Sequence, residues 1–381
     1  MNRHTFLHIA SGAMLLSFTA TAALADITIG VTIPTTGPGA ALGIPLKNSV
    51  ELWPKEIDGE KLNVIMLDDA GDASTATTNA RRFINDDKVD VIFGSALTPA
   101  SIAVSGAANE GGVPQFSACP VPPNVAQSKW TFVVPHDAQF IAKALFAKMK
   151  ADGVKTVGYI GFADSYGDLW VNQFKTVGKE YGLEIVAEER YARPDTSVSG
   201  QVLKLVAARP DAMVVGASGT GAALPQLALR ERGYADRIYQ THGAATIDFL
   251  RIAGASAQNT YFASSAVIVA EMLPDSSRVK AESLAYVTAY EDKYGAGSRT
   301  PFGPHSHDVM AILQKAVPVA MKSAKPGTPE FRAALRDAIE SGGPFPASQG
   351  VYEYAPDNHL GVDESDVVLL TVEDGKFVLA D

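Results

Sequence analysis

The sequence predicts an α/β protein made of two similar lobes, each built on a doubly wound, mainly parallel sheet. Short apolar runs rich in Val and Ile alternate with longer amphipathic runs, and this alternation implies parallel strands joined by helical crossovers. A polar turn, a buried strand and a closing glycine occur at 86–94 and again at 209–216. No linker rich in Gly, Ser or Pro separates the halves, so we expect several short crossings between the lobes.

The first half contains the expected elements of one lobe. Its short apolar runs predict buried strands at 27–33, 62–67, 89–93 and 113–116. Amphipathic runs predict helices at 73–87 and 98–109, and a further helical run covers 46–57. Pro54 lies inside that last run, so we expect the helix to kink or stop there.

The second half repeats this alternation and then changes character. Strands are expected at 154–160, 184–189, 212–215 and 238–241, with helices between them at 166–181, 197–208 and 221–233. Apolar residues at three- and four-residue spacing then predict helices at 279–294, 307–321 and 330–340. The chain closes with a predicted hairpin, 367–372 and 377–379, around a turn that carries Asp374 and Gly375.

The N-terminal residues 1–25 predict a secretory signal peptide. A basic start with Arg3 is followed by an apolar stretch over 6–18 and by small residues that end at Ala25. Such a segment is removed on export, and we expect cleavage after Ala25. No later stretch is apolar for long enough to span a bilayer, so the sequence predicts a soluble protein of the periplasm.

The composition argues against several classes of protein. The formal net charge is −10 and charges of both signs are mixed along the chain, which argues against a nucleic-acid partner. Cys119 is the only cysteine, so a disulfide framework within the chain is excluded. We expect a monomer without a cofactor, a metal or catalytic residues.

Candidate ligand-binding residues follow the predicted strands. In open α/β sheets a ligand binds at the carboxyl ends of the strands, where the N–H groups of the next helix donate hydrogen bonds to anions. In the first half, Thr98 falls at the expected N-cap of a helix and Cys119 falls in a proline-rich turn. Thr98 either only caps its helix or also helps to hold an anion, and the sequence leaves both roles open. In the second half, Tyr166 and His242 follow corresponding strands.

The order and spacing of several motifs are similar to those of a known family. The matching segments are 29–31, 36–38, 68–69, 87–94, 112–117, 164–167 and 229–233. Together they resemble the periplasmic solute-binding proteins of ABC importers, of the branched-chain amino acid (Leu/Ile/Val) type, over the whole chain after residue 25. This resemblance implies a type I fold with three crossings that form a hinge, and a membrane permease as partner. It implies a first lobe of 26–135 and 268–345 and a second lobe of 136–267 and 346–381.

The resemblance also implies roles for individual residues. In the first lobe, Thr98 would donate its hydroxyl to a ligand carboxylate, and the other expected contacts are a side wall at Leu42 and backbone donors near Cys119 and Val121. In the second lobe, the implied contacts are Tyr166, Ser218 and His242. The sequence departs from the family pattern at His242, where amino acid binders have a Glu that pairs with the ligand ammonium.

This departure changes the expected ligand. A buried ammonium without an anionic partner costs several kcal/mol, and a neutral His242 supplies no negative charge unless Asp164 reaches the ligand. We therefore predict a small carboxylate without an α-amino group, such as benzoate or a hydroxycinnamate. A branched-chain or hydrophobic amino acid remains as an alternative ligand, and a sensory receptor remains as an alternative role.

Two rival functions have weaker signals. Glycines at 216–221 lie between a strand and a helix, as in dinucleotide-binding enzymes, but no Tyr has a Lys four residues later as short-chain dehydrogenases require. His305 and His307 supply only half of a typical zinc site.

Overall fold

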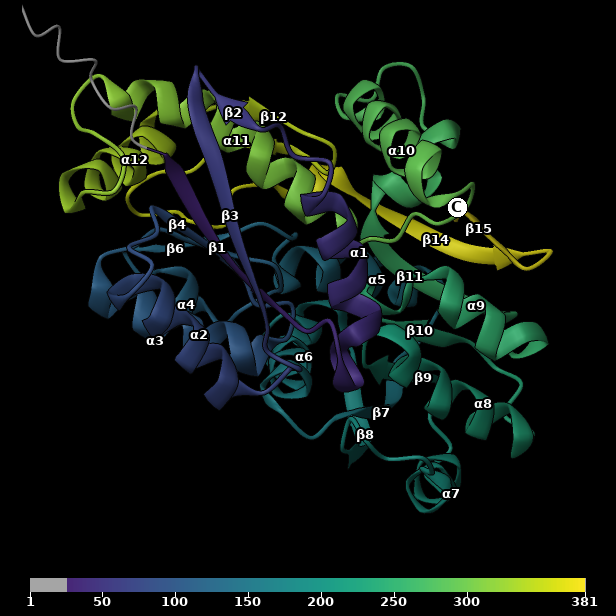
Figure 1. Cartoon of the computed structure of the whole chain (residues 1–381). Coiled ribbons are helices and arrows are strands. Elements are labelled where there is room, and N and C mark those ends of the chain that lie inside the picture. The colour runs from purple at the N-terminus through teal and green to yellow at the C-terminus, as the bar shows by residue number, and fades with distance from the viewer. Residues whose placement is uncertain (1–25, 381) are drawn as a thin grey trace, which may run out of the picture.

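The structure, a computed structural model, describes residues 26–380 and contains two separate sheets, each with its own helices (Figure 1). The predicted signal peptide, 1–25, and its cleavage after Ala25 lie outside the described residues. Within the described part of the chain, the helices are too short or too polar to cross a membrane.

The first lobe is built on a six-stranded sheet with the strand order β2-β3-β1-β4-β5-β6. Its strands are β1 (Ile27–Ile33), β2 (Glu56–Ile57), β3 (Glu60–Asp68), β4 (Val91–Gly94), β5 (Gln115–Ser117) and β6 (Thr131–Val133). All neighbours are parallel except β2 and β3. The first-lobe helices are η1 (Gly37–Gly39), α1 (Ala40–Val50), α2 (Ala73–Asn85), α3 (Thr98–Gly111), α4 (Pro123–Ala126), α11 (Gly303–Met321) and α12 (Pro329–Ser341). In Figure 1, α11 and α12 return late in the chain to lie beside the first strands.

The second lobe is built on a seven-stranded sheet with the strand order β15-β14-β11-β10-β9-β7-β8. Its parallel strands are β7 (Thr156–Phe162), β8 (Glu184–Tyr191), β9 (Ala212–Gly216), β10 (Ile238–Gln240) and β11 (Thr260–Ser265). The terminal hairpin, β14 (Val367–Glu373) and β15 (Lys376–Leu379), adds antiparallel to β11.

Helices cover the faces of this second sheet and connect its strands. The α-helices are α5 (Ala138–Ala151), α6 (Ser165–Thr176), α7 (Ser199–Ala207), α8 (Ala223–Glu231) and α9 (Ile247–Ala253). Short 3₁₀ segments are η2 (Gly178–Tyr181), η3 (Gly219–Ala222), η4 (His242–Ala244), η5 (Gly254–Ala257), η6 (Ala266–Met272) and η7 (Glu364–Asp366). The remaining elements are α10 (Lys280–Tyr294), which packs on η6, and the ribbon of β12 (Phe345–Pro346) and β13 (Val351–Tyr352).

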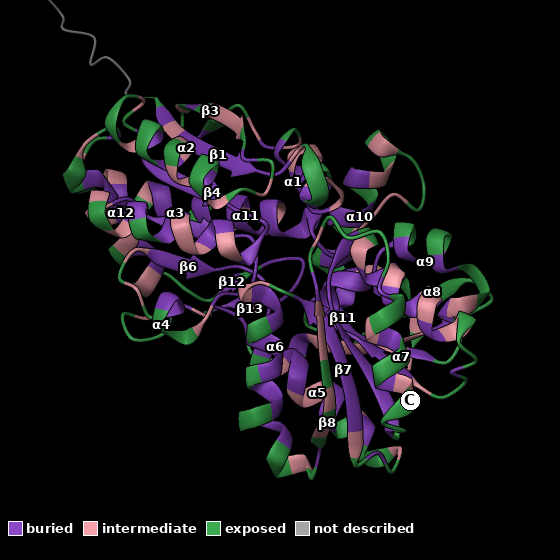
Figure 2. Cartoon of the chain, turned by 90° about the horizontal axis from the view of Figure 1, so that it is seen from below, coloured by how far each residue is buried: buried purple, intermediate pink, exposed green. Residues whose placement is uncertain are grey.

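Each lobe has its own hydrophobic core around its sheet. Every residue of β4 and of β9 is buried, because helices cover both faces of a parallel sheet. Figure 2 shows buried residues along the central strands and exposed residues on the outer faces of the helices. The continuous Val- and Ile-rich runs in the sequence are therefore central strands, and the predicted two-lobe α/β class is confirmed.

Three connections join the lobes. They run from β6 to α5, from β11 towards α10 and α11, and from β13 to β14. Tyr352 and Val362 belong to the first core, whereas Val367 begins β14 of the second sheet. The residue ranges predicted for the two lobes stay a prediction, and we propose moving their last boundary from 345/346 to the stretch between Val362 and Val367.

The helical run predicted over 46–57 starts too late, whereas the helix ends before Pro54, as that proline led us to expect. Helix α1 starts at Ala40 and ends at Val50, before Pro54. Residues 56–57 form β2 instead, because Asp58 and Gly59 both adopt positive φ values (52° and 84°) and make a two-residue hairpin turn into β3. The prediction also lacked several elements, among them α5 and β11.

Candidate functional site

A narrow cavity lies between the two lobes, and the space in it that is open to the centre of a water molecule is about 10 Å³. Its walls come from the residues that follow β1, β4 and β5 in the first lobe and β7, β8, β9 and β10 in the second. The carboxyl ends of parallel strands meet at one edge of a sheet, and here the two such edges face each other. Phe302 and His305, at the start of α11, complete the walls.

Six of the seven predicted ligand-binding residues line this cavity, and Val121 does not. Val121 is buried in a small apolar cluster with Cys119, Val125, Ala126 and Val133. The six residues that meet at the cavity are Leu42, Thr98, Cys119, Tyr166, Ser218 and His242.

Thr98 begins α3 rather than capping it. The N-cap is Leu97, whose carbonyl accepts the Ser101 N–H at 2.8 Å, so the predicted N-cap is wrong by one residue. The Thr98 hydroxyl donates to the Pro120 carbonyl at 2.9 Å and ties α3 to the loop after β5. Helix α3 has no side-chain cap, so its first amides remain open to an anion.

Cys119 contributes an apolar wall. Burial raises the pKa of its thiol to about 11, so the thiol is protonated at neutral pH. The Ser117 hydroxyl donates to the Cys119 carbonyl at 2.7 Å and fixes the turn after β5. These contacts give no support to a nucleophilic role for Cys119.

Tyr166 presents its ring to the cavity while its hydroxyl binds its own lobe. The Thr241 hydroxyl donates to the Ala217 carbonyl at 2.7 Å, so in the 2.9 Å pair between Tyr166 and Thr241 the tyrosine is the donor. Burial raises the pKa of Tyr166 to about 12. Tyr166 therefore has no donor left for a ligand in this arrangement.

Arg193 places a guanidinium in the cavity wall, and sequence reasoning missed it. Its Nε donates to Asp164 Oδ2 at 2.7 Å, and its Nη1 lies 3.4 Å from the Ser218 hydroxyl. The guanidinium carbon lies 4.0 Å from the centre of the Phe162 ring. Among the described residues that line the cavity, Arg193 is the only Lys, Arg, Asp or Glu.

Asp164 holds both Arg193 and the start of α6. Its side chain accepts the Tyr166 and Gly167 N–H groups at 2.9 and 3.3 Å, as an N-cap does, while its other oxygen pairs with Arg193. Asp164 is not among the residues that line the cavity. Its carboxylate is therefore occupied, and it does not supply the anion that a ligand ammonium would need.

His242 is neutral in this environment. Burial lowers the pKa of its imidazole to about 3, with a smaller contribution from His136. Its ring centre lies 6.2 Å from that of Tyr166 and 6.1 Å from that of Trp170. The side chain brings hydrogen-bonding capacity to the cavity but no charge.

The glycine-rich loop at 216–221 packs against the opposite lobe. Gly219 has a φ of +58°, and a Cβ there would lie 2.8 Å from Leu42 Cδ1. Only glycine permits both this conformation and this approach. Leu42 thus lies where a phosphate would have to approach the loop, which disfavours the dinucleotide-binding alternative.

His305 and His307 face different surroundings. His305 Nδ1 lies 2.8 Å from Gln349 Nε2, whereas the His307 ring lies 5.2 Å from that of Tyr286. Among residues 26–380, no cluster of three or more His, Cys, Asp or Glu side chains has a geometry that fits a metal ion.

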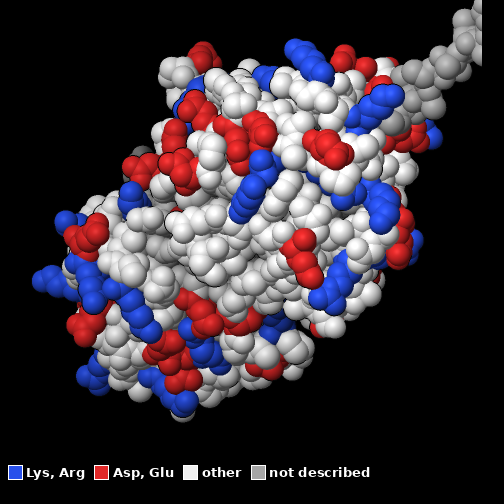
Figure 3. Space-filling view, turned by 90° about the vertical axis from the view of Figure 1, so that its left-hand side faces the viewer, with Lys and Arg blue, Asp and Glu red and all other residues white. Residues whose placement is uncertain are grey.

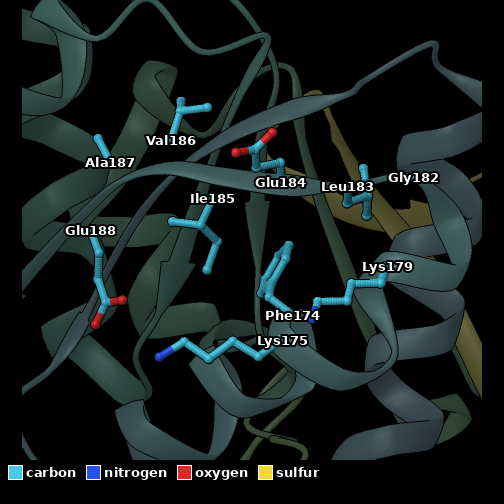
Figure 4. Close-up of a pocket in the computed structure, with 10 residues that line it drawn as sticks. All are labelled: Phe174, Lys175, Lys179, Gly182, Leu183, Glu184, Ile185, Val186, Ala187 and Glu188. Atoms are coloured by element: carbon cyan, nitrogen blue, oxygen red, sulfur yellow. The ribbon is translucent and has the colours of Figure 1, made fainter.

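A wider groove lies on the second lobe alone, over edge strand β8 (Figure 4). Phe174 and Ile185 form its apolar floor, and Lys175, Lys179 and Glu188 lie around it. None of the predicted ligand-binding residues lines this groove, and a ligand there would not contact both lobes.

On the face of the molecule shown in Figure 3, charged side chains of both signs are intermingled.

The missed residues had weak sequence signals. Arg193 follows β8, so the strand-end rule would have included it had its loop been considered. Phe302 and His305 come from the start of α11, more than 180 residues after Leu97 and Cys119, and no local pattern links them.

A family model described as periplasmic binding protein matches residues 26–376. The chain belongs to this family. As a periplasmic binding protein it resembles Leu/Ile/Val-binding protein homolog 3 of Brucella melitensis, with 24% identity over 371 residues, 94% of this chain and 95% of the relative. The predicted membership in the branched-chain amino acid-binding type is confirmed, and the family is one of solute-binding proteins.

Solved structures agree with this assignment. An extracellular ligand-binding receptor from Rhodopseudomonas palustris HaA2 is 53% identical, with a TM-score of 0.91 and coverage of 93% of this chain and 100% of that one. A solute-binding protein of an ABC transporter from R. palustris, solved in complex with benzoate, is 19% identical and has a TM-score of 0.80. The alignment with the benzoate complex covers 93% of this chain and 95% of that one, and it shows that the two proteins share a fold.

Proposed function

We propose that this periplasmic binding protein captures a small carboxylate without an α-amino group, in particular an aromatic acid, and delivers it to the permease of an ABC importer. The observation that carries the proposal is the charge of the interlobe cavity. Arg193 contributes a positive charge to the described wall, and no Asp or Glu lies in that wall. A carboxylate gains a partner there, whereas an ammonium would lose its water without gaining an anion.

The walls favour an aromatic body for the ligand. Leu42, Leu97 and Phe302 surround the cavity together with the Tyr166 ring, so apolar and aromatic groups form most of its surface away from Arg193. The structural neighbour that contains benzoate supports the same ligand class, because it pairs this fold with an aromatic acid.

In the proposed mechanism the carboxylate lies between the two lobes. The open amides of α3 act from the first lobe, and the Arg193 guanidinium acts from the second. A ligand stabilises the closed arrangement only as far as it contacts both lobes, and an anion between α3 and Arg193 does so. Asp164 keeps Arg193 in position through their 2.7 Å ion pair.

Calorimetry with matched ligand pairs tests the proposal. L-Phenylalanine and 3-phenylpropionate differ only in the α-amino group, as do L-leucine and 4-methylpentanoate. We expect each plain acid to bind at least about 100-fold more tightly than its amino acid, because the ammonium has no anionic partner. Micromolar binding of leucine with no detectable binding of benzoate or 3-phenylpropionate would refute the proposal.

The variant His242→Glu tests the same assignment from the opposite direction. It restores an acid at the position where amino acid binders of the family have one, so we expect leucine binding to become measurable. Affinity for 3-phenylpropionate should fall at least about 10-fold, since a second carboxylate then repels it. His242→Gln, which adds no charge, is the matched control and should leave leucine undetected.

A further inference from the structure

A second small cavity adjoins the ligand cavity, and His242 and His305 line both. The space in it that is open to the centre of a water molecule is about 10 Å³, which is room for one small polar group. Its remaining polar walls come from His136 after β6, from Ser264 and Ser265 at the end of β11, and from Gln349 in the turn between β12 and β13. We call it the hinge cavity, defined by these six residues.

Several polar atoms around the hinge cavity have no partner. Four side-chain atoms are buried and form no hydrogen bond to any described residue: His136 Nε2, His242 Nδ1, Ser264 Oγ and Ser265 Oγ. Their residues are between 0% and 8% exposed. Buried polar groups in folded proteins are nearly always paired, so four such atoms around one cavity indicate that a polar group from outside the chain completes them.

The hydrogen bonds of Gln349 fix the tautomer of His305. The backbone N–H groups of Ser348 and Gln349 donate to the Asp308 carboxylate, so Asp308 is an acceptor. The side-chain amide nitrogen of Gln349 lies 3.0 Å from Asp308 Oδ2 and 2.8 Å from His305 Nδ1. Because this nitrogen donates to both, His305 Nδ1 accepts and the ring carries its hydrogen on Nε2. The walls of the hinge cavity therefore offer the His305 Nε2–H group as a donor, in addition to the hydroxyls of Ser264 and Ser265.

The hinge cavity is neutral. Burial lowers the pKa of His136 to about 4 and that of His242 and His305 to about 3, so all three rings are uncharged at pH 7. No Lys, Arg, Asp or Glu is among the described residues that line it. A second charged group on the ligand would lose its hydration there without gaining a counter-ion, whereas a hydroxyl can both donate and accept.

We propose that the hinge cavity binds a neutral hydroxyl at the end of the ligand remote from its carboxylate. The ligand is then an elongated acid, with its carboxylate near Arg193 and its hydroxyl among Ser264, Ser265 and His136. This inference rests on the proposed function, since the carboxylate sets the direction in which the ligand lies. It also means that the distal group contacts the connections about which the lobes move.

A comparison of two ligands tests the proposal on the unmodified protein. 4-Hydroxycinnamate and 4-methylcinnamate have the same carboxylate and nearly the same shape, and differ in whether the distal group forms hydrogen bonds. We expect calorimetry to show at least about 10-fold tighter binding of the hydroxyl compound, because a site built for a hydroxyl rejects an analogue that lacks it.

The possible outcomes separate this proposal from the proposed function. Equal affinities, or tighter binding of the methyl compound, overturn the hydroxyl site while the carboxylate site stands. Failure of both acids to bind, together with binding of leucine, overturns the proposed function itself and the hydroxyl site with it.

Variants locate the hydroxyl. In the double variant Ser264→Ala/Ser265→Ala, we expect 4-hydroxycinnamate to bind no more than about 3-fold more tightly than 4-methylcinnamate. The affinity for 4-methylcinnamate should be unchanged, because only hydrogen bonds to the hydroxyl are lost. Ser49→Ala is the control, since Ser49 is equally buried, also has an unpaired hydroxyl and lines neither cavity. His136→Gln gives an independent second measurement and should also lower the ratio of the two affinities. A ratio that persists in both hinge variants overturns the proposal.

Discussion

Two strand–helix junctions face each other across the cavity, and their helix N-termini are satisfied in different ways. In the first lobe, α3 starts after Leu97 without a side-chain cap, so its first amides are open. In the second lobe, the Asp164 carboxylate caps α6 and pairs with Arg193. The junction after β4 in the first sheet thus offers open amides, and the junction after β7 in the second sheet offers a guanidinium.

Under the proposed function, this difference lets the two lobes hold one carboxylate by different groups. A helix N-terminus that already has its own carboxylate has little attraction left for a second anion, whereas an uncapped terminus keeps its partial positive charge. The second lobe compensates through Arg193, whose charge Asp164 positions and partly balances. The expected consequence is that both lobes attract a carboxylate, by different groups.

Of the variants at the two junctions, Arg193→Met should weaken ligand binding the most. It removes the only charge of the described cavity wall. Loss of one partner of a buried, hydrogen-bonded charge pair typically costs about 3 kcal/mol, so we expect roughly 100-fold weaker binding of 3-phenylpropionate by calorimetry. Arg251→Met, at an exposed arginine paired with Asp248, is the control and should bind normally. Retained affinity in Arg193→Met would mean that the second lobe binds the ligand without this charge.

The acid dependence of stability tests whether the hinge cavity is neutral. Burial lowers the pKa of His136 to about 4, below its usual value near 6.5, so between these values the unfolded chain binds more protons than the folded one. The free energy of unfolding should therefore decrease as the pH falls through this window, by about 2 kcal/mol from His136 alone between pH 7 and 4.5.

Denaturant unfolding of His136→Asn at both pH values measures this contribution. The loss of stability on acidification should be smaller by that amount than in the unsubstituted protein. An identical loss in the two proteins would show that folding does not lower the pKa of His136, and the hinge cavity would then not be neutral.

Thr98→Ala should have the smallest effect, on the first-lobe junction. The hydroxyl donates its one hydrogen to the Pro120 carbonyl, so it acts on the ligand only by holding the start of α3 against the loop after β5. We expect a loss of about 1 kcal/mol in binding of 3-phenylpropionate, roughly 5-fold, whereas Thr98→Ser should retain the affinity. Unchanged affinity in the alanine variant would place the carboxylate elsewhere than at the start of α3.

Much of the fold was predictable because its signals are local. The Val- and Ile-rich runs identified β1, β4, β7 and β9 to within two residues, since strands buried on both faces need continuous apolar sequence. The helix predicted over 46–57 starts earlier, at Ala40, and ends before Pro54 as expected, while the turn at Asp58 and Gly59 makes residues 56–57 part of β2. Six of the predicted residues line the cavity because strand ends converge at one edge, whereas Val121, in the same apolar cluster as Cys119, does not reach it.

By itself, the sequence determined the two-lobe class and the strand ends, because these depend on residue type and local periodicity. The tertiary structure alone decided the chemistry of the cavity. Arg193 lies in the cavity wall because Asp164, 29 residues earlier, holds its guanidinium there. His136, Ser264 and Gln349 meet because the loop after β6, the end of β11 and the turn between β12 and β13 converge, and the direction of a side chain depends on packing that no local pattern encodes.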